Sequence, residues 1–143
     1  MRRLAIIVAL TATTATAQER FSEIDGDTLK GSEPIAVIIE EPRYRVLGLE
    51  TPEKGGKADC PLERAAAPRA TAALREYLDR GAQPVPPFKL DSFGRVLARI
   101  DYKGEDVAEL MIERKLGVAW AGKAHRWCEG APMWSPMPVG RKR

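Results

Sequence analysis

Three short clusters of charged residues hold the side chains of this sequence that could do chemistry. The first is Asp25-Gly26-Asp27-Thr28, where two carboxylates flank a glycine at which the backbone can bend sharply. Hard cations such as Ca²⁺ take oxygen ligands at short range, so a bent strand that aims Asp27 inward would supply one ligand. An Asx-type turn uses the same residues without any cation, and this cluster alone does not separate the two interpretations.

The second and third clusters combine arginine with carboxylates. Arg45 lies in a strand pattern that is followed by Glu50-Thr51-Pro52-Glu53, and Arg95 ends the turn Asp91-Ser92-Phe93-Gly94-Arg95. Phosphodiester hydrolysis needs a cation, a carboxylate that orients or deprotonates water, and guanidinium groups that match phosphate oxygens. A surface ion-pair network and a solvated hairpin arginine are the non-catalytic interpretations of the same residues.

The elements that must position these clusters are short strands and two helices. Strand patterns cover 21–29, with a bulge or sharp bend at 25–27, and then 35–39, 44–49 and 95–101, which a hairpin at 102–104 closes. The stretch 82–88 holds three prolines and must be extended. Strands, a helix, strands and a helix give an α+β order, and five short strands fit a small closed or nearly closed barrel.

Two helices follow from the periodicity of apolar residues. The alanine-rich stretch 62–79, ended by Gly81, predicts one helix that is kinked at Pro68. Apolar residues at helical spacing within 107–114 predict a second helix, with Gly117 as its C-terminal cap. The chain beyond Trp120 is rich in proline and glycine, so we expect an irregular tail at 121–143 whose aromatic residues cover the barrel.

The first seventeen residues differ from the rest. Arg2 and Arg3 precede an apolar run at 4–10, and Ala15-Thr16-Ala17 provides a small-x-small cleavage signal. This pattern is typical of a secretory signal peptide at 1–17, and the run is shorter than the roughly 18 residues of a membrane span. We therefore expect a periplasmic or extracellular protein without stable membrane insertion. Loss of two of the 23 basic residues, with all 20 acidic ones kept, lowers the net charge from +3 to +1, so charge alone does not indicate nucleic acid.

The two cysteines of the sequence, Cys60 and Cys128, predict one disulfide. An oxidising compartment favours a bridge, and a structural metal site would need three or four soft ligands. Two unpaired buried thiols are the alternative. A bridge closing a loop of this length would add roughly 4 kcal/mol and would hold the irregular C-terminal segment to the body.

Together and in this order, the clusters resemble the staphylococcal nuclease (thermonuclease) family. The resemblance rests on four stretches and covers roughly residues 21–120, within a predicted domain of 18–120: Asp25-Gly26-Asp27-Thr28, Arg45-Val46-Leu47-Gly48-Leu49-Glu50-Thr51-Pro52-Glu53, Asp91-Ser92-Phe93-Gly94-Arg95-Val96-Leu97-Ala98 and the segment 110–119. The family fold is a five-stranded OB-type β-barrel with two or three packed helices. The resemblance therefore implies a Ca²⁺-dependent nuclease that hydrolyses DNA or RNA and leaves a 5′-hydroxyl, and we expect a monomer.

The resemblance also implies a role for each residue of the site. The carboxylates of Asp27 and Glu50 and the backbone carbonyl of Thr51 would bind Ca²⁺. Glu53 would hold and activate the attacking water. Two arginines would clamp the phosphate and stabilise the charge that builds on it, namely Arg45 and Arg95.

Glu50 departs from the family, which usually has aspartate at that position. The extra methylene moves the carboxylate by roughly 1.3 Å, compared with a tolerance of about 0.5 Å in a productive site. Ser92 also replaces a basic residue of the founding member. These differences leave a second hypothesis, a weakened or inactive barrel that binds nucleic acid or a protein partner.

Overall fold

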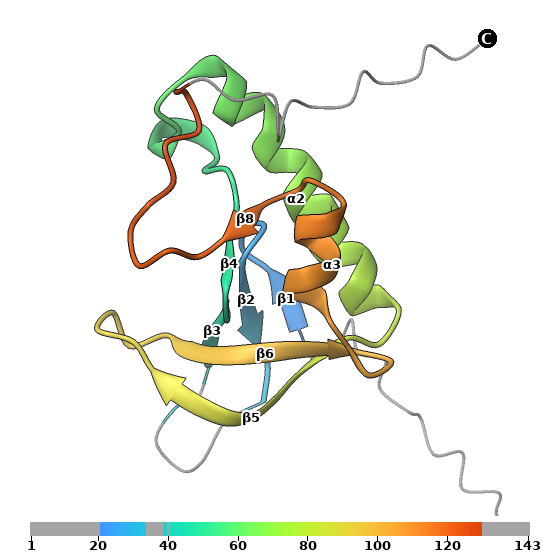
Figure 1. Ribbon diagram of the computed structural model, residues 1–143. Helices are drawn as coiled ribbons and strands as arrows, with labels where there is room; N and C mark the ends of the chain where they lie inside the picture. Colours follow the sequence, from blue (N-terminus) through green and yellow to red (C-terminus); the bar gives the residue numbers. More distant parts are fainter. Residues whose placement is uncertain (1–20, 34–38, 40, 130–143) are drawn as a thin grey trace, which may run out of the picture.

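The computed structural model describes residues 21–33, 39 and 41–129, and the predicted α+β class is confirmed in them. The predicted leader at 1–17, most of the predicted strand at 35–39 and the end of the tail at 130–143 lie outside the described residues. A curled mixed sheet is covered by two helices (Figure 1). The elements are β1 (Phe21–Glu23), β2 (Thr28–Gly31), β3 (Arg43–Val46), β4 (Leu49–Glu50), η1 (Gly55–Lys57), α2 (Pro61–Asp79), β5 (Gln83–Leu90), β6 (Val96–Tyr102), β7 (Glu105–Asp106), α3 (Val107–Glu113) and β8 (Val118–Ala119).

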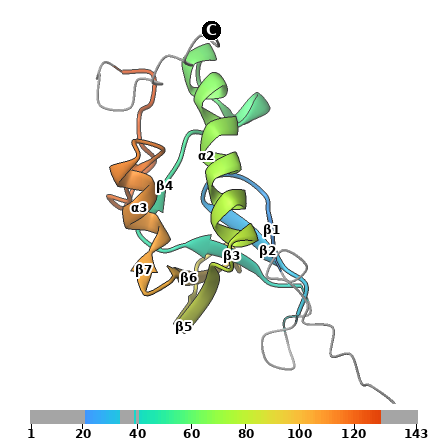
Figure 2. The ribbon, with the colours of Figure 1, turned by 90° about the vertical axis from the view of Figure 1, so that its right-hand side faces the viewer.

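The main sheet has the strand order β1-β2-β3-β6-β5, and β7 pairs with β6. Its neighbouring strands are antiparallel except β3 and β6, which are parallel. Parallel neighbours need a long crossover, and the segment that contains α2 and β5 provides it. No ladder joins β1 to β5 in the described residues, so the sheet is an open half-barrel. In both views α2 and α3 lie side by side above β5 and β6 (Figure 1, Figure 2).

The core lies between the sheet and the two helices. Tyr44 and Val46 of β3 are buried there, together with alternate residues of β6 and a row of small and apolar residues on α2. Because side chains alternate along a strand, Arg45 points to the opposite face of the sheet. Its register partner on β6 is Leu97, so Arg95, two residues earlier, is on the same face as Arg45.

Two of the predicted strands are each divided into two. The segment 21–29 is not one bulged strand but the hairpin β1–β2, because the amides of Ile24 and Asp25 both bond to the carbonyl of Thr28 and reverse the chain. The segment 44–49 ends as β3 at Val46, and Gly48, with φ +79°, turns the chain into β4. β4 then pairs with β8 in a separate two-stranded sheet.

The first predicted helix is confirmed as the single helix α2, which continues through Pro68. The second, α3, ends earlier than predicted, and the C-terminal cap assigned to Gly117 is wrong. Lys115, with φ +57°, takes the left-handed position after the helix. Gly117 instead lies against β4, where an added Cβ would be 2.6 Å from the carbonyl oxygen of Glu50.

The described part of the tail, 121–129, contains no helix or strand, as predicted, and it packs on the body. Trp127 is buried against Ala66 of α2 and Val118 of β8. The Sγ atoms of Cys60 and Cys128 are 2.15 Å apart, at disulfide distance, and their Cα atoms are 6.1 Å apart. Neither described helix is long and apolar enough to cross a membrane.

Candidate functional site

Arg45 is the centre of the predicted site. Its Nη1 is 2.5 Å from Oδ1 of Asp27, and its Nη2 is 2.5 Å from Oε2 of Glu50 and 3.2 Å from the carbonyl oxygen of Leu49. All three charged side chains are largely buried, with exposed fractions of 13% for Arg45, 6% for Asp27 and 10% for Glu50. One guanidinium therefore joins the first and second sequence clusters.

Asp27 accepts hydrogen bonds from two strands and from the loop that follows β4. Its Oδ1 also accepts a bond from the Thr28 hydroxyl at 3.1 Å, and its Oδ2 accepts the backbone amide of Thr51 at 3.0 Å. Burial raises the pKa of Asp27 to about 7, an effect that Arg45 opposes and that the Asp25 and Glu50 carboxylates increase. The protonation of this group is thus sensitive to any cation placed beside it.

Close backbone approach fixes Thr51 next to Asp27. An added Cβ on Gly26 would be 2.7 Å from the Thr51 hydroxyl oxygen and 2.7 Å from the Ala70 Cβ on α2. An added Cβ on Gly117 would be 3.2 Å from Cγ2 of Thr51, in addition to its contact with Glu50. Both glycines are therefore needed for the chain to pass this closely around the candidate metal ligands.

Glu50 lies at the boundary between the site and the tail. Burial raises its pKa, the Arg45 guanidinium opposes this effect, and the charge of Glu53 adds to it. The backbone amide of His125 also bonds to the Glu50 carboxylate and favours its charged form. Glu50 opens on a pocket of about 270 Å³ that is also lined by Ala119 of β8 and by the tail residues Ala121, Lys123, Ala124, His125, Arg126 and Glu129.

Glu53 follows the site on the loop between β4 and α2. Among the described residues no donor bonds to its carboxylate, which is half-buried. Burial raises the pKa of Glu53, the Asp25 carboxylate adds to the increase, and Lys57 opposes it. A more basic carboxylate without a hydrogen-bonding partner is suited to accept a proton from water.

Arg95 is not brought into contact with this group. Its Nε bonds to Oδ2 of Asp91 at 2.7 Å, and its guanidinium lies over the exposed ring of Phe93 at 5.5 Å. The parallel register places it on the same face of the sheet as Arg45, where the side chains of Arg43 and Lys89 are exposed. The third cluster is thus a neighbour of the site rather than a part of its hydrogen-bond network.

The oxygen atoms of this site are of the type that binds hard cations, but only a few of them converge. Two carboxylates, Asp27 and Glu50, converge on one guanidinium, and Thr51 directly follows Glu50 in the chain. Within the described ranges no group of three or more His, Cys, Asp or Glu side chains could hold a metal ion. Ca²⁺ at this point would have to replace Arg45 as the partner of the two carboxylates and take its remaining ligands from water or substrate.

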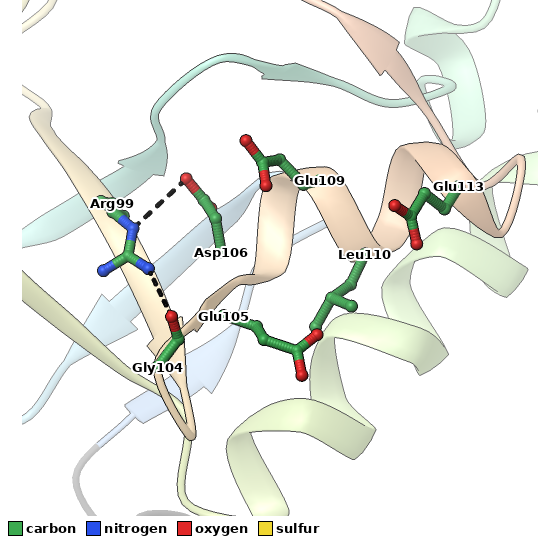
Figure 3. Close-up of a pocket in the computed structure, with 7 residues that line it drawn as sticks. All are labelled: Arg99, Gly104, Glu105, Asp106, Glu109, Leu110 and Glu113. Atoms are coloured by element: carbon green, nitrogen blue, oxygen red, sulfur yellow. Dashed lines mark hydrogen bonds and ion pairs between the residues drawn. The ribbon is translucent and has the colours of Figure 1, made fainter.

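An acidic pocket of about 280 Å³ lies where the end of β6, β7 and α3 meet, and it is lined by none of the predicted site residues (Figure 3). Arg99 lies 3.5 Å from Asp106 and bonds to the carbonyl oxygen of Gly104 at 3.2 Å. Glu105, Glu109 and Glu113 line the same pocket. A basic residue thus already balances part of its charge, and we do not assign it a function.

Sequence reasoning missed two residues that shape the site. Trp120 lies under Arg45, with the guanidinium carbon 5.4 Å from the ring centroid. Glu63, which is only 2% exposed, accepts the backbone amides of Glu53 at 2.9 Å and Asp59 at 2.7 Å. The sequence signal for Glu63 was its position as an acidic residue in the first turn of α2. The contact of Trp120 with Arg45 depends instead on the pairing of β8 with β4.

Two comparisons with known proteins identify no family for this chain. No family model matches the sequence, and no curated protein matches it. The function must therefore be argued from the geometry of Arg45, Asp27, Glu50 and Glu53 and from the sequence resemblance.

Proposed function

We propose that this protein is a secreted, Ca²⁺-dependent phosphodiesterase that hydrolyses nucleic acid. The observation that carries the proposal is the convergence of Asp27 and Glu50 on Arg45, next to the loop with Glu53. Two segments that are apart in the sequence, one with Asp27 and one running from Arg45 to Glu53, supply a guanidinium, two hard-cation ligands and a carboxylate to which no described residue donates a hydrogen bond. The resemblance to the staphylococcal nuclease family assigns those same residues to catalysis.

Each residue then has a chemical role. Asp27 and Glu50 would hold the cation, Glu53 would accept the proton of the attacking water, and Arg45 would turn from the carboxylates to the phosphate oxygens. A bound Ca²⁺ would reduce the repulsion between carboxylates and phosphate and would polarise the water. Because Arg45 bonds to both carboxylates, a cation held by them would compete with Arg45, and its release would be coupled to cation binding.

Nucleic acid is the substrate class that the surroundings favour. Arg43, Lys89 and Arg95 add positive charge on the Arg45 face of the sheet, and two exposed aromatic rings, Phe93 and Trp120, lie near arginines. Basic grooves with aromatic side chains bind single strands through the phosphates and by stacking on the bases. The proposal also assigns a fold, namely an OB-type barrel formed by β1, β2, β3, β6 and β5. The open sheet is compatible with such a barrel.

The test is hydrolysis of single-stranded DNA and RNA by purified oxidised protein lacking residues 1–17. We expect cleavage that requires Ca²⁺, stops with EDTA and falls by at least 10²-fold in Arg45→Ala, the order seen when a charge-stabilising group is removed. Arg99→Ala is the matched control, since Arg99 lies on β6 but pairs with Asp101 and Asp106. No cleavage by the wild type, or equal cleavage by Arg45→Ala, would refute the proposal.

A second function, binding of nucleic acid without cleavage, is favoured by Glu50 and by the small number of metal ligands. In that case oligonucleotide binds equally with Ca²⁺ and with EDTA. Glu50→Asp separates the two possibilities, because it restores the carboxylate length usual in the family. Cleavage that appears only in Glu50→Asp identifies a barrel that has lost catalysis, whereas binding without cleavage in both proteins supports the binding function.

A further inference from the structure

We propose that Glu63 is a positioning residue for this site, because its buried carboxylate fixes the backbone of the loop that carries Glu53. This inference rests on the proposed function, in which Glu53 acts on water. Glu63 itself is on α2, ten residues away from Glu53 in the chain, and it has no place in the sequence clusters.

The setting of Glu63 is unusual for a glutamate. Its side chain is almost completely buried, and it forms no ion pair among the described residues. Each oxygen instead accepts one backbone amide of the loop, Oε1 from Glu53 and Oε2 from Asp59. A buried carboxylate is costly unless it is fully hydrogen-bonded, so both contacts are needed to keep it there.

The first turn of α2 makes this arrangement rigid. Pro61 occupies the first turn, the N-cap residue Cys60 makes no side-chain cap bond, and Glu63 points to the loop from a helix end that favours negative charge. Cys60 is also the residue joined to Cys128, and α2 packs along the core beyond this turn. The carboxylate of Glu63 is thus attached to a helix that both the Cys60–Cys128 pair and the core anchor.

The backbone of the loop is held weakly within itself. Residues 54–57 are exposed, and the backbone bonds of η1 are long, 3.3 Å from the Lys57 amide and 3.4 Å from the Ala58 amide. Two exposed side-chain bonds add to them, from Arg64 Nε to the Gly55 carbonyl oxygen at 3.1 Å and from Lys54 Nζ to the Ile24 carbonyl oxygen. Glu63 joins the two ends of this loop, at residues 53 and 59. Asp27 holds the amide of Thr51 at the other side of Glu53, so the short segment 51–53 is fixed at both ends.

Kinetics on Glu63 variants separate positioning from mere stabilisation. Glu63→Asp keeps the charge but is too short to reach both amides, and Glu63→Gln keeps the length but replaces one acceptor by a donor. We expect kcat to fall by roughly 10- to 100-fold in both, since a displacement of about 1 Å can cost that much, with KM within about twofold of the wild type. Glu76→Gln on the exposed side of α2 is the charge-matched control and should leave both constants unchanged.

Amide hydrogen exchange gives a readout that does not require activity. In the wild type the amides of Glu53 and Asp59 should exchange at least tenfold more slowly than those of Lys54 and Gly56 in the same loop, and Glu63→Gln should remove the protection of one of them.

Two results would overturn the inference: folded Glu63 variants with wild-type kcat, or wild-type amides of Glu53 and Asp59 that exchange as fast as that of Gly56. The second measurement decides even if the variants do not fold. Absence of wild-type hydrolysis would instead refute the proposed function and the catalytic role of Glu63, while the protection of the two amides would still show whether Glu63 fixes the loop.

Discussion

Replacement of Arg45 by alanine should destabilise the protein strongly when Ca²⁺ is absent and much less when it is present. The variant leaves the carboxylates of Asp27 and Glu50 next to each other without their shared partner. Both are at least nine-tenths buried, so water solvates them far less well than it solvates exposed carboxylates. The contact of the Arg45 guanidinium with the ring of Trp120 is lost as well.

The expected cost follows from the burial of the three groups. Removal of one member of a buried ion pair costs about 3–5 kcal/mol. Asp27, with a pKa raised to about 7, can take up a proton in response and limit the damage, so we expect a loss near the lower end, about 3 kcal/mol. Arg99→Ala, whose ion pairs lie at the surface, should cost less than about 1 kcal/mol.

Urea denaturation of oxidised protein at pH 7.5, with EDTA and then with Ca²⁺, measures both effects. A cation at 100 times its dissociation constant stabilises a protein by about 2.7 kcal/mol. Because the variant need not exchange Arg45 for the cation, Ca²⁺ should raise the free energy of unfolding more in Arg45→Ala than in the wild type. The reasoning is refuted if Arg45→Ala loses no more than Arg99→Ala, or if Ca²⁺ stabilises both proteins equally.

Three further predictions concern groups around the site. Gly117→Ala should cost about 1–3 kcal/mol because its Cβ meets the backbone of β4, whereas Gly56→Ala, with open space around it, should be neutral in the same thermal or urea denaturation. Because the pKa of Asp27 is raised, the stability that this group contributes in EDTA is full below about pH 4 and is lost as the pH rises through 7. As the pH rises from 5 to 8, the free energy of unfolding should therefore fall less in Asp27→Asn than in the wild type. Identical dependence on pH in the two proteins would contradict the raised pKa. A double Cys60→Ser and Cys128→Ser variant should lose about 4 kcal/mol, and a loss below 1 kcal/mol would show that the bridge does not hold the tail.

The regular elements with a clear local signal could be predicted from the sequence. The alanine-rich pattern gave α2 to within one residue at its start, and Lys103-Gly104 closes the predicted hairpin with positive φ at both residues, as such a turn requires. The strands that depend on distant partners could not be predicted. β4 and β8 have two residues each, and only their pairing with each other makes them strands.

The same distinction applies to the site. The residue types and order of the three clusters indicate Arg45, Asp27 and Glu50 before any geometry is known, and these three do meet. Sequence could not show that Arg95 bonds to Asp91 rather than to this group, because that choice is made by the turn after β5. Nor could it show that Glu63 turns its carboxylate back to the loop, since an acidic residue in a first helical turn more often faces solvent.

Nuclease activity of wild type and Glu53→Gln over a Ca²⁺ titration tests the central claim most directly. Glu53→Gln keeps the shape of the side chain and removes the proton acceptor, and Glu109→Gln in the acidic pocket of Figure 3 is the control for loss of one carboxylate. We predict Ca²⁺-dependent cleavage of single-stranded nucleic acid by the wild type and by Glu109→Gln, and a loss of at least 10²-fold in Glu53→Gln. Wild-type protein that cleaves at no Ca²⁺ concentration, or Glu53→Gln that cleaves as fast as the wild type, would contradict the claim.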